Sequence, residues 1–112
     1  MGIYAIHYTY PDDLTELLKV RPEHREWLTG LHGVLVAGMY QAGHHEVSEG
    51  EPSDEEPPHA ALIAYEAGSI DEVVSTFEHD PYWQNGFVLR RVVREWDPPL
   101  GRWAAEEGPF GA

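Results

Sequence analysis

Short segments rich in β-branched and aromatic residues alternate along the chain with segments of helical periodicity. Strands are predicted at residues 3–10, 34–41, 60–65 and 87–96. In the first strand, alternation divides the residues into two faces: Tyr4, Ile6, Tyr8 and Tyr10 on one, and Ile3, Ala5, His7 and Thr9 on the other. Both faces are largely apolar, which is typical of an inner strand covered on both sides.

The clearest helical pattern follows Gly68. One apolar face is formed by Ile70, Val73, Val74 and Phe77. Ser69 and Glu72 have the spacing of a capping box at the helix start. Pro81 stops the helix, so Asp80 is expected just beyond its last turn.

The segment between the first two strands also predicts helix. Leucines at 14, 17 and 18 indicate a helical turn or two, and Pro22 is typical of a first helical position. The residue before a proline is disfavoured in the α region, so the main helix is predicted to begin at Pro22 and to end near His32, before Gly33. If the helical path is instead continuous, one stripe faces the sheet: Leu17, Arg21, His24, Leu28 and Leu31.

The order strand, helix, strand, strand, helix, strand predicts an α+β domain over residues 1–97. Right-handed crossovers give a ferredoxin-like βαββαβ fold, a four-stranded antiparallel sheet with two helices on one face. Residues 44–58 are acidic and rich in Gly and Pro, and are expected to form a flexible hairpin loop; residues 98–112 form a Gly-, Pro- and Ala-rich tail. A second subunit could cover the open sheet face and complete a dimeric α+β barrel.

Composition narrows the function classes. The 112-residue chain has a formal net charge of −13, which argues against nucleic acid or an anionic membrane as a partner. It has no cysteine, so disulfides, thiolate metal sites and cysteine nucleophiles are excluded. We find no signal-peptide pattern after Met1 and no apolar run long enough to cross a membrane, so a cytoplasmic protein is expected.

Two residues carry the candidate chemistry. His24 is expected in the first turn of the helix that begins at Pro22, where the positive end of the helix dipole favours neutral imidazole, the form of a general base. Asp80, fixed before Pro81, could orient this imidazole if the fold brings them together. In the alternative interpretation, His24 packs at the core edge with one hydrogen bond and Arg21 extends to solvent.

Other polar clusters have less specific interpretations. A hairpin could gather His44, His45 and His59 into a metal site, although exposed loop histidines explain them equally, and no metal or cofactor is predicted. The basic residues of the last strand could bind an anionic substrate or pair with the acidic loop across a dimer, but a structural role is favoured. Gly38 within the second strand indicates a bulge or a close approach to the backbone.

These motifs together resemble the YciI-like (YCII-related) proteins. The resemblance covers about Tyr4 to Trp96, and includes Arg-Pro-Glu-His at 21–24, Val-Ala-Gly at 36–38 and Asp-Pro-Tyr-Trp at 80–83. It implies a ferredoxin-like dimer with an active site built on a His–Asp pair, here His24 and Asp80. One relative is a dehydrochlorinase acting on a chlorinated hydroxyhydroquinone. The long acidic hairpin and the extended tail depart from the family pattern.

The sequence thus favours a cofactor-independent lyase or isomerase that moves a proton on a small oxygenated compound, which could be aromatic or halogenated. His24 would be the base and Asp80 its orienting partner. The predicted substrate-binding residues are Arg21, Tyr82, His7 and Gly38. The alternatives are a non-catalytic ligand-binding or accessory module and a dimeric-barrel monooxygenase.

Overall fold

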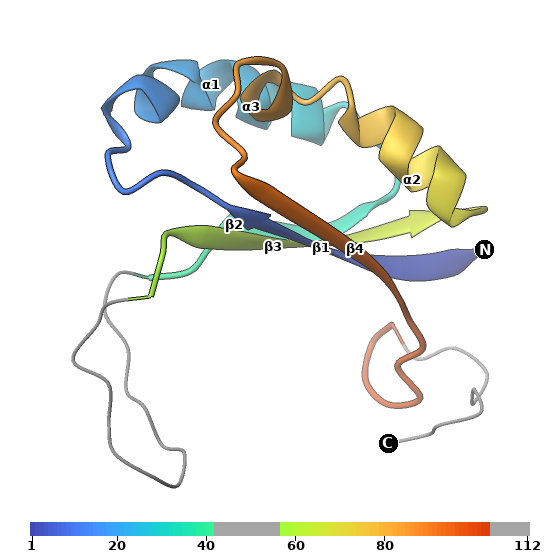
Figure 1. The fold of residues 1–112 in the computed structure, drawn as a ribbon. Coiled ribbons are helices and arrows are strands. Elements are labelled where there is room, and N and C mark those ends of the chain that lie inside the picture. The colour runs from blue at the N-terminus through green and yellow to red at the C-terminus, as the bar shows by residue number, and fades with distance from the viewer. Residues whose placement is uncertain (42–56, 104–112) are drawn as a thin grey trace, which may run out of the picture.

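A computed structural model describes residues 1–41 and 57–103 of the chain (Figure 1). The elements follow in the order β1 (Gly2–Thr9), α1 (Thr15–Thr29), β2 (Val34–Met39), β3 (Ala60–Ala67), α2 (Ile70–Phe77), α3 (Pro81–Gln84) and β4 (Arg90–Trp96). Most of the predicted acidic hairpin and the end of the predicted tail lie outside the described residues.

The strands form one antiparallel sheet in the order β2-β3-β1-β4. The helices lie together over one face of this sheet, as Figure 1 shows. The predicted ferredoxin-like α+β fold is therefore confirmed. Because β1 is an inner strand and the first helix crosses to the far edge strand β2, α1 spans the β3–β2 half of the sheet, whereas α2 and α3 follow β3 and lead into β4.

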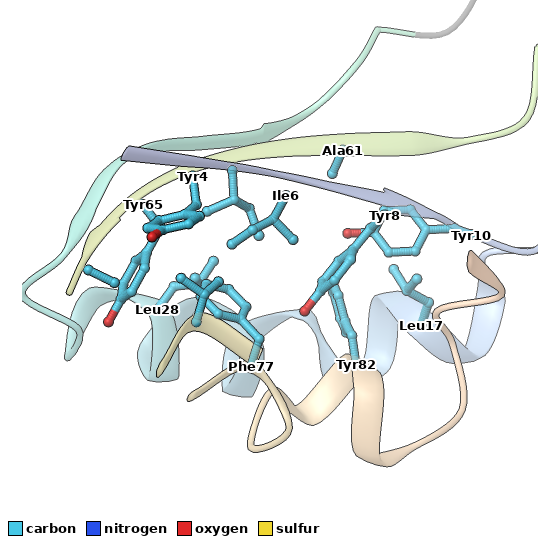
Figure 2. Packing of buried hydrophobic residues seen from close by; sticks show 13 residues of the cluster. Tyr4, Ile6, Tyr8, Tyr10, Leu17, Leu28, Ala61, Tyr65, Phe77 and Tyr82 are labelled. Carbon is cyan, nitrogen blue, oxygen red and sulfur yellow. The ribbon is translucent and has the colours of Figure 1, made fainter. Parts of the chain in front are cut away.

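The alternation in β1 determines which face forms the core. Tyr4, Ile6 and Tyr8 point towards the helices and are buried, as is Tyr10 just beyond the strand. Figure 2 shows Tyr8, Tyr10 and Tyr82 grouped at one end of the cluster, while Tyr4, Tyr65 and Phe77 lie at the other. The aromatic pairs meet edge to face, with ring centroids 5.7 Å apart for Tyr10–Tyr82 and 5.2 Å for Tyr65–Phe77.

The opposite face of β1 is covered unevenly within one subunit, where Ile3 is buried. His7 is exposed, and Ala5 and Thr9 are half-buried. Within a single subunit, the helices cover only the side that carries Tyr4, Ile6 and Tyr8.

The predicted start of the first helix is wrong. α1 begins at Thr15 and runs through Pro22, so Arg21 is helical and His24 lies in the second half of the helix rather than in its first turn. Asp13 accepts hydrogen bonds from the backbone N–H and the hydroxyl of Thr15, which supports the earlier start. The helix ends at Thr29 rather than near His32. The alternative of a continuous helical path is the one observed.

Packing explains why proline does not end this helix. Leu17 and Leu28 lie on opposite sides of Pro22 in the sequence, and both are buried on the sheet-facing stripe with His24. Only an uninterrupted helix places all three on one face. Pro22 itself is exposed, so its ring does not have to be packed within the core. Burial of the stripe offsets the backbone hydrogen bond that proline cannot make.

The second helix is close to its prediction, with one addition. Ser69 caps α2 by accepting from the N–H of Glu72, while the Glu72 carboxylate accepts from Gly68 rather than from Ser69. The short helix α3 was not predicted; Asp80 is its N-cap.

Gly38 has neither the bulge nor the close contact within the chain that was predicted for it. The ladder irregularity in β2 falls between Val34 and Val36, and a Cβ built on Gly38 would meet nothing within 4 Å. The close approach is instead at Gly33, where a Cβ would collide with the backbone oxygen of Glu66. Gly38 is therefore neither a bulge nor a tight contact in this chain.

No helix among residues 1–41 and 57–103 is both long and apolar enough to span a bilayer.

Candidate active site

The fold brings His24 and Asp80 together. Nδ1 of His24 lies 2.6 Å from Oδ1 of Asp80, although the residues are 56 positions apart in the sequence. His24 is 7% exposed and Asp80 is fully buried. A carboxylate has only acceptors, so Nδ1 supplies the hydrogen of this bond. In the neutral imidazole, Nε2 is then the nitrogen that carries the lone pair.

Local sequence explains the position of Asp80. It caps α3, and its Oδ1 also accepts from the backbone N–H of Tyr82 at 2.9 Å. Pro81 occupies the first helical position, where its fixed φ suits the turn. The carboxylate thus combines an ordinary capping role with the contact to His24. The Asp-Pro-Tyr segment therefore fixes the position of the Asp80 carboxylate through its own helix cap.

Tyr8 completes the surroundings of Asp80 from the sheet. Its hydroxyl donates to Oδ2 of Asp80 at 2.9 Å. Burial raises the pKa of Tyr8 well above its ordinary value, and the nearby Asp80 charge raises it further. Tyr8 therefore remains a hydrogen-bond donor throughout the neutral range. With it, the carboxylate receives hydrogen bonds from α1, α3 and β1.

Tyr82 fixes the plane of the imidazole. The His24 and Tyr82 rings stack with centroids 3.7 Å apart and planes within 7°. Burial raises the pKa of the Tyr82 hydroxyl, while the positive charges of Arg21 and Arg25 act in the opposite direction. Stacking and the Asp80 hydrogen bond together restrain both rotation and tilt of the His24 ring.

A second contact group encloses the turn that carries Asp80. Arg91 of β4 donates to Glu78 at 3.1 Å, and the Trp83 indole N–H donates to the other oxygen of the same carboxylate at 2.9 Å. The Arg91 guanidinium also lies 3.7 Å from the Trp83 ring centroid. We call Arg91, Glu78 and Trp83 the outer clamp. The structure thus gives Arg91 a structural contact within its own chain.

His24 faces a cavity of about 440 Å³ between α1 and the β2–β3 half of the sheet. Apolar and aromatic side chains supply much of its wall, among them Tyr10, Leu14, Leu28, Met39, Tyr40, Ile63 and Tyr82. Its basic groups are Arg21, Arg25, His24 and His59. Nη2 of Arg21 lies 3.4 Å from the Met39 sulfur, a weak acceptor, and the Arg21 guanidinium also interacts with the Tyr82 hydroxyl. Such a mixed, concave surface is typical of small-molecule sites.

The predicted site residues divide into two groups. His24, Arg21, Tyr82 and Gly38 line the cavity, and Asp80 lies directly behind His24. His7 points from β1 to the opposite face of the sheet, where its ring lies 6.2 Å from that of Tyr40, and it does not line the cavity.

Sequence reasoning missed Tyr8, Arg25 and His59. Tyr8 was assigned to the core by alternation, but its hydrogen bond to a residue 72 positions away leaves no local signal. Arg25 could have been found from its position four residues after Arg21, which places both on one side of a continuous helix. His59 was considered only with His44 and His45, which lie outside the described residues.

Residues 1–41 and 57–103 contain no cluster of three or more His, Asp or Glu side chains suited to a metal ion.

Comparison with known proteins identifies the family. The YCII-related domain model matches residues 1–97, so the chain belongs to the YCII-related domain family. Among solved structures, it is similar to 5-chloro-2-hydroxyhydroquinone dehydrochlorinase from Burkholderia phenoliruptrix AC1100 in complex with 2,5-dihydroxybenzoquinone. The two are 21% identical, with a TM-score of 0.66 over 92% of this chain and 99% of the other, a likeness that concerns the fold. No curated protein matches the chain.

The Tyr8 hydroxyl should contribute to stability through Asp80. In Tyr8→Phe, Oδ2 of a fully buried carboxylate loses its donor, and the free energy of unfolding should fall by about 1–3 kcal/mol. Tyr10→Phe is the matched control, because that neighbouring buried phenol makes no hydrogen bond to Asp80. Urea denaturation of both variants measures the difference. Equal losses would show that the bond to Asp80 adds no stability.

The outer clamp should stabilise the fold only while Glu78 is ionised. The hydrogen bond from Arg91 holds the pKa of Glu78 below its ordinary value, and the bond from Trp83 acts in the same direction. A lowered folded-state pKa gives stability that is present above the unfolded value, about 4.3, and is lost as the pH falls through the folded value. Glu78→Gln should therefore be less stable than the wild type at pH 7, with the gap closing below about pH 4.

Thermal denaturation between pH 3 and pH 7 tests this prediction. Glu16→Gln is the control, since Glu16 pairs with Lys19 where both side chains are about two-thirds exposed. A gap that is independent of pH would contradict a role for the Glu78 charge.

Proposed function

We propose that this YCII-related protein is a cofactor-independent enzyme that transfers a proton on a small oxygenated compound, with His24 as general base. The observation that carries the proposal is the buried 2.6 Å contact between His24 and Asp80 beside the cavity. An imidazole whose Nδ1 is held by a carboxylate presents Nε2 as the base, and the carboxylate stabilises the imidazolium that forms.

Arg21 supplies the complementary charge. It lines the cavity with His24, three residues before it on α1, and its guanidinium makes no ion pair with a described carboxylate. Removal of a proton next to a carbonyl or from a phenol leaves negative charge on oxygen, and a guanidinium stabilises such an oxygen. Arg21 would therefore hold the developing enolate or phenolate while Nε2 of His24 takes the proton. Tyr82 supports the site by stacking on the base.

The chemistry of the structural neighbour suggests a reaction. A dehydrochlorinase removes a proton and a chloride ion from the same molecule, so a base and a stabilised oxyanion are sufficient for it. The cavity here has the groups that such an elimination needs. We propose elimination from, or isomerisation of, an oxygenated ring that could carry halogen, and assign proton removal to His24.

Two other functions remain as alternatives with distinct outcomes. A non-catalytic binding module would use the same cavity, with His24 as a hydrogen-bonding group. A monooxygenase of the dimeric-barrel kind would consume oxygen. The first predicts binding without turnover, and the second predicts oxygen uptake without chloride release.

The decisive experiment incubates the protein with chlorinated hydroxyhydroquinones and their chlorine-free counterparts in deuterated buffer. Chloride release reports elimination, deuterium in the recovered compound reports isomerisation, and an oxygen electrode reports oxidation. We expect chloride release or deuterium incorporation by the wild type. His24→Asn should lower kcat by about 10²–10⁴-fold, because the amide N–H can still reach Asp80 while the base at Nε2 is gone.

A second variant, Asp80→Asn, removes the negative charge of Asp80 while keeping the shape of its side chain. Asp80→Asn can keep its oxygen towards His24 and Tyr82 and turn its amide N–H towards the Tyr8 oxygen, but it has no negative charge. Its kcat should fall by about 10²-fold or more. His32→Gln removes an exposed histidine outside the cavity and should behave as the wild type. Full activity of His24→Asn would refute the proposed base.

We also propose that the protein is a homodimer that covers the open face of the sheet. That face carries Val36 at 48% exposure and Trp96 at 39%, with half-buried Leu62 and Val92 between them. The strand pairings place these residues on the side opposite the helices. A second copy that packs on this surface would remove it from water.

Sedimentation should give twice the mass of the chain. Val36→Glu should shift the protein towards monomer, because a charge in an apolar interface loses its hydration. Leu18→Glu is the matched control, an equally exposed apolar residue (44%) on α1. A wild type that sediments as a monomer would end the dimer proposal.

A further inference from the structure

The charged side chains described in the cavity wall have the opposite sign to the chain as a whole. The whole protein has 20 acidic residues against 7 Lys and Arg. The cavity wall nevertheless includes Arg21 and Arg25 and no described Asp or Glu. Low-dielectric walls around basic groups concentrate their field inside a cleft, so the described wall of this cavity favours an anionic ligand although the chain as a whole is acidic.

The two arginines of the cavity wall differ in their exposure to solvent. Arg21 is half-buried and contacts Met39 of β2, whereas Arg25, one helical turn later, is exposed. Neither forms an ion pair with a carboxylate of residues 1–41 or 57–103. Both arginines line the cavity together with His24 and Tyr82. Hydrogen bonding and charge from Arg21, and more weakly the charge of Arg25, oppose the rise in the pKa of Tyr82.

Proton removal needs only one of these charges. Arg21 beside His24 suffices for an oxyanion that develops during reaction. Arg25 adds to the cavity wall a second guanidinium that proton removal does not require, and negative charge that the ligand already carries when it arrives would use it. Guanidinium groups bind carboxylates through two parallel hydrogen bonds. The apolar and aromatic side chains of the cavity wall suit a flat ring that reaches both arginines.

We infer that the ligand of this cavity is a planar organic anion whose ionised group, a carboxylate, binds to Arg25 while a second oxygen reaches Arg21. Arg25 is then a specificity-determining residue that selects ionised over neutral ring compounds. The inference rests on the proposed function for the identity of the cavity as the active site. It concerns recognition rather than turnover.

A matched pair of probes tests the inference. 2,5-Dihydroxybenzoate and 2,5-dihydroxybenzamide share a ring and hydroxyl pattern and differ in the charge of one substituent. Calorimetry or NMR titration of the wild type should give an affinity for the benzoate about tenfold or more above that for the amide. The preference should shrink from 20 mM to about 500 mM salt, as expected for a partly exposed ion pair.

Variants that each remove one positive charge, inside or outside the cavity, identify the residue that causes the preference for the benzoate. Arg25→Gln should reduce benzoate affinity about five- to tenfold and leave amide affinity unchanged, and Arg25→Lys should keep part of the preference. Arg102→Gln, in the segment after β4, removes the same charge outside the cavity and should preserve the preference. Because Arg25 is exposed, its replacement leaves the core intact.

The outcomes separate this inference from the proposed function. Equal affinity of the wild type for both probes, including no measurable binding of either, overturns the inference, whereas turnover of a neutral compound would leave the proposed function standing. A preference that survives Arg25→Gln also overturns it. Charge-selective binding without any turnover by the wild type would support the inference while removing the proposed enzyme.

Discussion

The structure depends on the burial of the Asp80 carboxylate. Removing an ionised carboxylate from water costs several kcal/mol unless hydrogen bonds replace its hydration. Here the donors are the imidazole of His24, the backbone N–H of Tyr82 and the hydroxyl of Tyr8. They belong to α1, α3 and β1, so the charge can be buried only when these three elements have their native positions. A single side chain thus couples the placement of the helices to that of the sheet.

The same coupling explains which parts of the molecule the sequence could predict. Strand alternation, the α2 pattern and the βαββαβ order depend on local periodicity, and all were recognised. The predicted start of α1 was wrong because Pro22 strongly favours a first helical position. That local preference does not include the free energy gained by burying Leu17 and Leu28 on one face of a longer helix. α3 is a single turn that has no periodicity to detect.

The candidate site was predictable in its main pair and not in its surroundings. His24 and Asp80 could be paired because the crossovers of this topology lie side by side. Tyr8 could not be assigned to them, since alternation shows only that it is buried. Arg25 was hidden by the mistaken helix start, because a helix that begins at Pro22 breaks its relation to Arg21. His7, a predicted substrate-binding residue, lies on the far face of the sheet, the side to which strand alternation had already assigned it.

The position of His24 within α1 changes the physical account of the proposed base. A histidine in the first turn would be kept neutral by the helix dipole, an effect that falls off beyond that turn. His24 lies farther along α1, beyond that first turn. Its tautomer is instead fixed by the Asp80 carboxylate and its ring plane by Tyr82. The position of the His24 imidazole therefore depends on the turn between α2 and α3, which the outer clamp holds against β4. Residues distant from the cavity can accordingly change how His24 is held, because they set where Asp80 lies.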